Sequence, residues 1–203
     1  MFNYSPDLDG RRARKALQTA EHLVKTAFGL FEEHGYDQVS MEQIASTADV
    51  AKGTLYKHFP VKEALIQHRF QADLARVEPD LRALLAMDLG CEPTLRLLFD
   101  HHADHAERTK PYLLRYLLYR MGQAPGAKRS GLDQIFRQIL EQGQVRGNIV
   151  AEQTAERLSS YLEVLMLGAV LRWLHSPGAN LKQDYGQMLD VFLNGARARG
   201  VTA

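Results

Sequence analysis

The stretch from Ser40 to Lys62, which reads SMEQIASTADVAKGTLYKHFPVK, constrains the fold more than any other part of the chain. Ser40 and Gln43 have the spacing of a capping box, in which each residue satisfies a free backbone amide of the other at the start of a helix. This pattern predicts a helix that begins at about Met41, with its apolar side chains turned inward.

A turn and a second short helix are predicted to follow. Residues 47–50 (TADV) are expected to form the turn, because Asp49 tolerates a left-handed backbone and its side chain competes for local hydrogen bonds. The second helix is expected over residues 51–58 and must stop before Pro60, since the residue that precedes a proline avoids the helical region. Two short helices joined in this way form a helix-turn-helix unit.

The second short helix has the side chains expected of a nucleic-acid reader, in which this helix enters the major groove with its N-terminal residues nearest the bases. Lys52 is expected to reach a guanine edge or a phosphate, and Tyr56 and Lys57 the sugar-phosphate chain. A solvated polar face on an ordinary helix is the alternative, but it leaves Gly53 unexplained, because glycine is costly inside a helix. His58 and Lys62 are expected to add phosphate contacts. The candidate DNA-contacting residues are Ser40, Lys52, Gly53, Thr54, Tyr56, Lys57, His58 and Lys62.

Residues 53–65, GTLYKHFPVKEAL, resemble the end of the DNA-binding domain of TetR-family transcriptional regulators. Further matching positions are Ala27, Phe28, Phe31, Gly35, Ile44, Ala45, Ala48 and Val50. The chain departs from the family pattern at Asp49, where Gly is usual, and at Ala51 and Val61, where Ser is common. Met41 and Glu42 occupy positions that often touch phosphate in relatives.

This resemblance implies an all-α protein of about nine helices. It implies an N-terminal three-helix helix-turn-helix DNA-binding domain, taken as residues 11–60, and a C-terminal helical domain for effector binding and dimerisation, taken as residues 61–203. It also implies a homodimer that binds a palindromic operator in double-stranded DNA.

Charge and composition bound the remaining possibilities. The net charge of the 203-residue chain is +1, so any attraction to nucleic acid depends on local placement of basic residues. Arg11, Arg12, Arg14 and Lys15 form one such cluster, which either lies near a duplex or is a solvated helix start. A single Cys excludes an internal disulfide, and no signal segment or membrane-spanning run is evident. A cytoplasmic protein without a membrane partner is therefore expected.

Apolar spacing predicts further helices after the helix-turn-helix unit. They are expected at 61–87, 94–108 and 111–121, from a cap at Ser130 and Asp133 to about 146, at 161–174, and from a cap at Asn180 and Gln183 to 196. Pro79 predicts a kink or break near Val77, and Pro111 is taken as the start of a new helix, because proline removes a hydrogen bond inside a helix.

The segment 100–105, DHHADH, is the oddest local cluster. His101 and His105 are one helical turn apart and could chelate a metal, but the sequence supplies no further ligands, so no metal site is predicted. The inward histidines are either polar points in a ligand pocket or core histidines satisfied by hydrogen bonds. The candidate effector pocket consists of His102, His105, Tyr112, Tyr116 and Phe136. The tyrosines are equally explained as ordinary core residues.

The helix at 161–174 is apolar on two faces. One face can close the core of its own chain, and the other needs a second surface, either inside a monomer or in a four-helix bundle of two copies. The family resemblance favours the dimer. The candidate interface residues are Tyr161, Val164, Gly168, Leu171, Met188 and Phe192.

Three functions remain open from these patterns. The first is a homodimeric repressor released from its operator by an unidentified small-molecule effector. The second is a DNA-binding regulator without such an effector. The third is an all-helical carrier or enzyme, but the sequence has no catalytic constellation, no glycine-rich phosphate loop and no cofactor motif, so neither catalytic residues nor cofactors are predicted.

Overall fold

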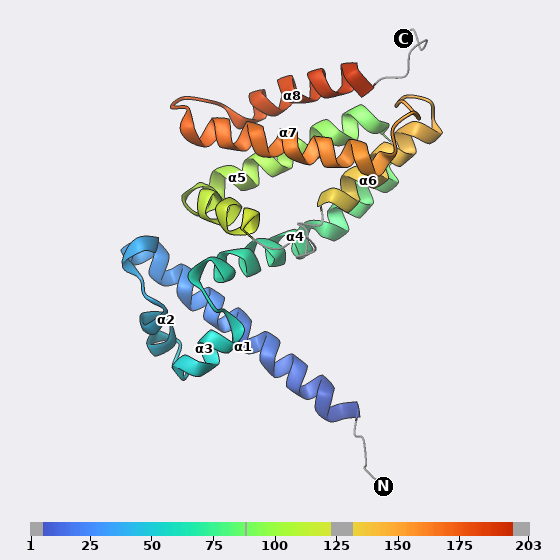
Figure 1. Ribbon diagram of the computed structural model, residues 1–203. Helices are drawn as coiled ribbons and strands as arrows, with labels where there is room; N and C mark the ends of the chain where they lie inside the picture. Colours follow the sequence, from blue (N-terminus) through green and yellow to red (C-terminus); the bar gives the residue numbers. More distant parts are fainter. Residues whose placement is uncertain (1–5, 88, 123–131, 197–203) are drawn as a thin grey trace. The chain divides into compact units, whose positions relative to one another are not determined.

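The computed structural model describes residues 6–87, 89–122 and 132–196 (Figure 1). Over these residues all regular structure is helical, with eight α-helices and one short 3-10 helix, η1. The all-α fold predicted from the sequence is confirmed. The chain forms two compact units, divided between Asp73 and Leu74 inside α4 (Lys62–Ala86).

The first unit comprises α1 (Pro6–His34), η1 (Tyr36–Gln38), α2 (Met41–Thr47), α3 (Lys52–His58) and the first half of α4. Its core consists of fully buried side chains that include Leu23, Ala27, Ile44, Leu55, Leu65 and Ile66. The first half of α1 extends beyond α2 and α3, and residues 10–18 are all exposed (Figure 1). The core therefore holds α2 and α3 on the second half of α1.

Local signals fix the ends of the short helices as predicted. The backbone amide of Gln43 donates to Oγ of Ser40 at 3.1 Å, and the amide of Ser40 donates to Oε1 of Gln43 at 2.7 Å, so the capping box is present. Asp49 has a φ of 53°, the left-handed conformation expected for the turn between α2 and α3. Ala51 precedes α3 and provides no side-chain cap.

The second unit contains α5 (Cys91–Met121), α6 (Leu132–Val145), α7 (Ala155–His175) and α8 (Leu181–Ala196). Helices α7 and α8 lie side by side, and α6 also packs against α7 (Figure 1). Aromatic rings join α5, α6 and α8 in the core: Phe99 stacks on Phe136 at 5.4 Å between centroids and meets Tyr185 edge-on at 4.8 Å. The cap predicted at Asn180 is confirmed, since Oδ1 of Asn180 accepts from the amide of Gln183 at 3.1 Å.

The two prolines inside helices have different outcomes. Helix α4 continues through Pro79, so the helix is not broken there, and a kink at this position stays a prediction. The new helix predicted to start at Pro111 was wrong, because α5 joins the helices predicted at 94–108 and 111–121 into one element. A proline inside a helix costs about 3 kcal/mol. In α5 this cost is offset by burial on both sides of the proline, because Ala106 and Leu113 both lie in the core. Ser130, the cap expected for α6, lies outside the described residues.

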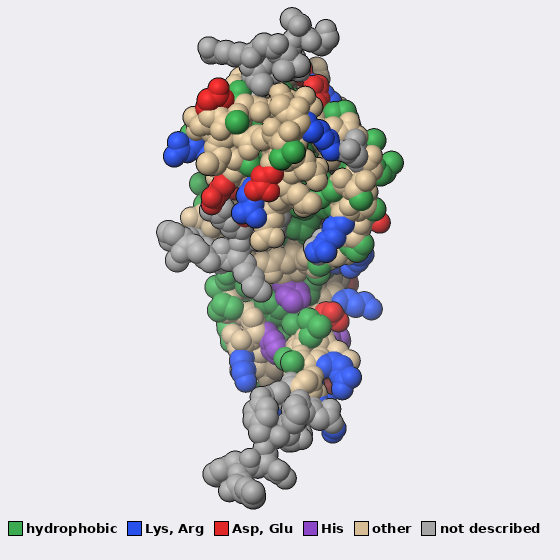
Figure 2. Space-filling model, turned by 90° about the vertical axis from the view of Figure 1, so that its right-hand side faces the viewer, with side chains coloured by type: hydrophobic (Ala, Val, Ile, Leu, Met, Phe, Trp, Pro, Cys, Tyr) green, Lys and Arg blue, Asp and Glu red, His purple; other side chains and the backbone are tan. Residues whose placement is uncertain are grey.

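Acidic and basic side chains are interspersed on the face of the molecule that Figure 2 shows. Together with the net charge of +1, this means that the face does not carry charge of one sign throughout. Within the described residues, none of the helices combines the length and the apolar character needed to span a lipid bilayer.

Candidate nucleic-acid interface

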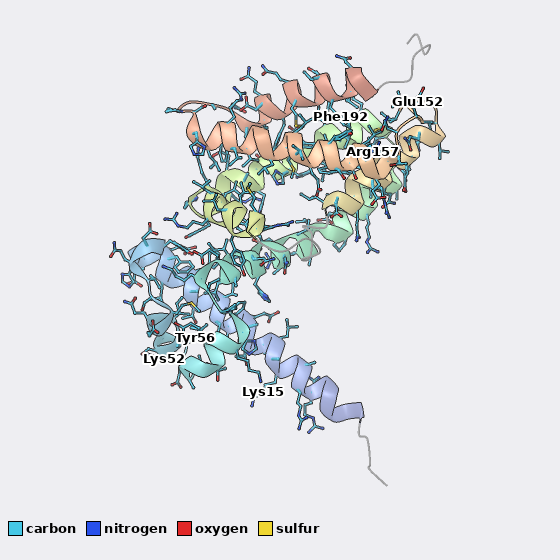
Figure 3. The ribbon with its side chains drawn as sticks, in the orientation of Figure 1. Lys15, Lys52, Tyr56, Glu152, Arg157 and Phe192 are labelled. Atoms are coloured by element: carbon cyan, nitrogen blue, oxygen red, sulfur yellow. The ribbon has the colours of Figure 1, made fainter. Side chains whose placement is uncertain are left out.

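Helix α3 is held by one apolar side chain and presents its polar residues outward. Leu55 is fully buried, whereas Lys52, Gly53, Tyr56 and Lys57 are exposed. Lys52 and Tyr56 lie close together on the same part of the first unit (Figure 3). The structure therefore brings together most of the predicted DNA-contacting residues on one outward face, with Thr54 and His58 half-buried at its edge.

Packing within the chain does not require glycine at position 53. Apart from its chain neighbours and the backbone of its own helix, a Cβ added to Gly53 would have no described atom within 4 Å. The backbone at this position of α3 is thus open to an outside partner, and a glycine allows that partner the closest approach.

Glu42, in the first turn of α2, joins two residues of α3. The Tyr56 hydroxyl donates to Oε1 of Glu42 at 3.2 Å, and Nζ of Lys52 lies 3.8 Å from the same oxygen. A hydrogen bond from its own backbone amide, followed by the one from Tyr56, lowers the pKa of the Glu42 carboxyl below its ordinary value. Desolvation, followed by the charge of Glu42, raises the pKa of Tyr56, so the hydroxyl keeps its proton. This contact was not predicted from the sequence.

Lys62 has an internal role in this structure. Its ammonium group donates to the backbone oxygens of Tyr36 and Val39, both at 2.7 Å, and lies 4.3 Å from the centre of the Tyr36 ring. The Tyr36 hydroxyl in turn donates to Oε1 of Glu63 at 2.9 Å. These contacts fasten the start of α4 to the connection between α1 and α2, and they compete with the phosphate contact expected for Lys62.

The basic cluster at Arg11, Arg12, Arg14 and Lys15 lies on the exposed first half of α1. Figure 3 shows Lys15 well away from Lys52 and Tyr56 within the first unit. Any duplex contact by this cluster would therefore be separate from the one made by α3.

Two of the five residues predicted to line an effector pocket contact the aromatic core of the second unit, where Phe136 is buried and His102 is half-buried. Nδ1 of His102 is 2.8 Å from the Tyr185 hydroxyl, and Phe136 stacks on Phe99. Burial, with repulsion from His105 second, lowers the pKa of His102 to about 4, so the imidazole that is hydrogen-bonded to Tyr185 is neutral. This geometry matches the hydrogen-bonded core histidine that the sequence left open as one of two readings.

The other pocket residues are half-buried. His105, Tyr112 and Tyr116 lie on α5, and Nη1 of Arg120 donates to the Tyr116 hydroxyl at 3.3 Å. A surface hollow of ≈ 220 Å³ between α5 and α8 has none of the five predicted residues in its wall. Its lining residues are Ala103, Asp104, Glu107, Asn180, Leu181 and Lys182.

The residues predicted at a dimer interface differ in exposure. Tyr161, Val164 and Gly168 are exposed on α7, Leu171 and Met188 are half-buried, and Phe192 is only 8% exposed in the single chain. The apolar surface around the first three also includes Leu165 of α7, and Val191 of α8 is 73% exposed.

The chain is similar to known bacterial regulatory proteins. Residues 23–68, which contain α2, α3 and the start of α4, match the family model for bacterial regulatory proteins of the tetR family. The chain is 36% identical over 64 residues to the A-factor receptor protein of Streptomyces griseus, which covers 32% of this chain but only 23% of that protein. It is 26% identical over 164 residues to the transcriptional repressor DhaR of a Mycobacterium species, covering 75% of this chain and 80% of DhaR.

One solved structure resembles this chain across both of its units. The transcriptional repressor FadR of Thermus thermophilus, solved in complex with lauroyl-CoA, superposes with a TM-score of 0.80 and 27% identity. The superposition covers 91% of this chain and 98% of FadR.

Proposed function

The chain belongs to the TetR family of bacterial regulatory proteins, and on that premise we propose that it is a homodimeric repressor that a small-molecule effector releases from its DNA operator. It acts as a cytoplasmic regulator and not as an enzyme. The proposal rests on the outward face of α3. Its cations are exposed, no described residue packs over Gly53, and the buried Leu55 anchors the helix.

Each residue of that face has a distinct role in DNA binding. Lys52, at the start of α3, reads a base edge, and Tyr56 and Lys57 bind phosphates and set the register of the complex. Gly53 lets the backbone approach the duplex. Replacing Lys52 by Ala is therefore expected to relax base preference at particular operator positions, whereas replacing Tyr56 by Phe weakens binding to every sequence.

Two copies are needed to read an inverted repeat. Recognition helices of a dimer bind half-sites about one helical turn, ~34 Å, apart. The exposed apolar side chains of α7, Tyr161, Val164 and Leu165, together with Val191 of α8, support pairing of these two helices with their copies in a four-helix bundle.

An acyl-CoA thioester is the first effector class to test. The support comes from Thermus thermophilus FadR, whose structure holds lauroyl-CoA and whose fold matches over most of this chain. An effector releases the protein from DNA only if it binds the released conformation more tightly than the DNA-bound one. A regulator without any small effector is the alternative.

Selection of bound duplexes from a random pool tests the DNA-binding proposal. The expected product is an inverted repeat, bound by a species with the mass of a dimer in light scattering. Retention of no duplex at low ionic strength by the folded protein would reject DNA binding, and a recovered motif without symmetry would reject the dimer.

Lauroyl-CoA is then added to the protein–operator complex, with free coenzyme A as the matched control. Release by lauroyl-CoA alone supports an acyl-CoA effector. Equal release by both compounds, or by neither, excludes the acyl chain as the signal.

A further inference from the structure

The contact between Glu42 and α3 has no role in the proposal above. Tyr56 and Lys52 are one helical turn apart on α3, and both approach the same carboxylate oxygen, Oε1 of Glu42. All three side chains are accessible: Tyr56 is 43% exposed, and the side chains of Lys52 and Glu42 are 66% and 47% exposed. The Glu42 carboxylate thus contacts both side chains, Lys52 and Tyr56, that are proposed to bind DNA.

This contact contributes little to the fold. Exposed ion pairs are weak because water screens them and because two long side chains lose freedom when they pair. The position of α3 is already fixed by the buried Leu55 and by the turn at Asp49. The contact can therefore open without disturbing α2 or α3.

A carboxylate oxygen and a phosphate oxygen make the same kind of contact with these two side chains. Both are anionic acceptors for a hydroxyl donor and an ammonium group. In the free protein the Glu42 carboxylate takes the place that a DNA phosphate would take. A phosphate that binds Tyr56 and Lys52 must displace this carboxylate and then lie close to its negative charge, which is unfavourable.

We propose that Glu42 is an internal competitor of DNA phosphates for Lys52 and Tyr56, and that it weakens sequence-independent binding to duplex DNA. The inference rests on the proposed DNA-binding function of α3. Since sequence-independent affinity comes almost entirely from phosphate contacts, a competitor at two of those contacts acts mainly on this component.

The test uses the full-length protein and a duplex of random sequence, with affinity measured over a range of salt concentrations. Glu42→Gln keeps the shape of the side chain and removes its charge. The variant is expected to bind about tenfold more tightly, with a salt slope steeper by about one, because Lys52 becomes available to one more phosphate. Its melting temperature is expected to stay at the wild-type value.

Two controls separate competition from a general change of charge. Glu33→Gln makes the same charge change in the last turn of α1, where Glu33 is 71% exposed beside His34, and should change affinity less than twofold. In a Lys52→Ala, Tyr56→Phe background, Glu42→Gln should lose most of its effect, because the groups in competition are gone.

Different outcomes would reject the competition by Glu42 and the DNA-binding function. Equal effects of Glu42→Gln and Glu33→Gln, or an undiminished effect of Glu42→Gln in the double-variant background, would overturn the competition. Failure of both the wild type and Glu42→Gln to bind any duplex would instead reject the DNA-binding function, and this inference with it.

Discussion

Two tyrosine hydroxyls, one in each unit, show how burial separates a contact that we propose to be functional from a structural one. Tyr56 donates to Glu42 on the surface of the first unit, and it is 43% exposed. The Tyr185 hydroxyl is hydrogen-bonded to Nδ1 of His102 in the second unit, and Tyr185 is 1% exposed. An exposed hydroxyl exchanges its partner for water or phosphate at little cost, whereas a buried one that loses its partner stays unsatisfied.

The charges of the groups that these two hydroxyls contact differ in the same way. Glu42 keeps its negative charge in contact with water, while burial keeps His102 neutral. Low dielectric makes the buried contact sensitive to any change of charge or partner. We therefore expect perturbations at Tyr185 and His102 to alter stability, and perturbations at Tyr56 and its neighbours to alter binding.

Acidification provides the largest expected effect. Burial lowers the pKa of His102 from its ordinary 6.5 to about 4, so the unfolded chain binds a proton at this residue at a higher pH than the folded chain does. The contribution of His102 to stability is therefore fully present above pH 6.5 and is lost as the pH falls toward 4. Its full size is up to about 3 kcal/mol, measured by denaturant unfolding at a series of pH values.

A matched pair of variants assigns that pH dependence. His102→Gln removes the titrating group and should flatten the stability profile between pH 6.5 and 4, although its stability at neutral pH is lower. His101→Gln, at an exposed position on the same helix, should keep the wild-type slope. If both variants keep that slope, another group is responsible.

Removing each hydroxyl in turn gives a smaller and more direct contrast. Tyr185→Phe leaves Nδ1 of His102 without its hydrogen-bond partner and is expected to cost about 1–2 kcal/mol in unfolding free energy. Tyr56→Phe makes the same chemical change at the surface and is expected to leave the melting temperature unchanged while weakening DNA binding. Equal losses of stability in the two variants would show that the exposed contact contributes as much to stability as the buried one.

The elements that the sequence predicted correctly are those set by neighbours along the chain. The capping box needs only Ser40 and Gln43, and the turn needs only Asp49. The effect of Pro111 was misjudged because local chemistry disfavours a helix at a proline, whereas the buried side chains before and after it belong to one packed helix.

The contacts that the sequence missed join residues far apart in the chain. His102 and Tyr185 are separated by 83 positions and meet because α5 packs on α8. The Glu42 contact likewise depends on how α2 crosses α3, which no spacing rule supplies. The exposed residues of α3 were predictable because their exposure follows from the helix and its one buried side, Leu55.

Lys57 and Lys62 provide the last and finest test, because the sequence assigned both to phosphate and the structure treats them differently. Lys57 is exposed, whereas the Lys62 ammonium group donates to two backbone oxygens. Lys57→Ala should weaken binding to all duplexes, reduce the salt slope by about one and leave the melting temperature unchanged. Lys62→Met should lower the melting temperature and leave the salt slope near the wild-type value. If Lys62→Met reduces the slope as much as Lys57→Ala does, Lys62 exchanges its carbonyl partners for phosphate on DNA. The same side chain would then make a structural contact in the free protein and a functional contact in the complex.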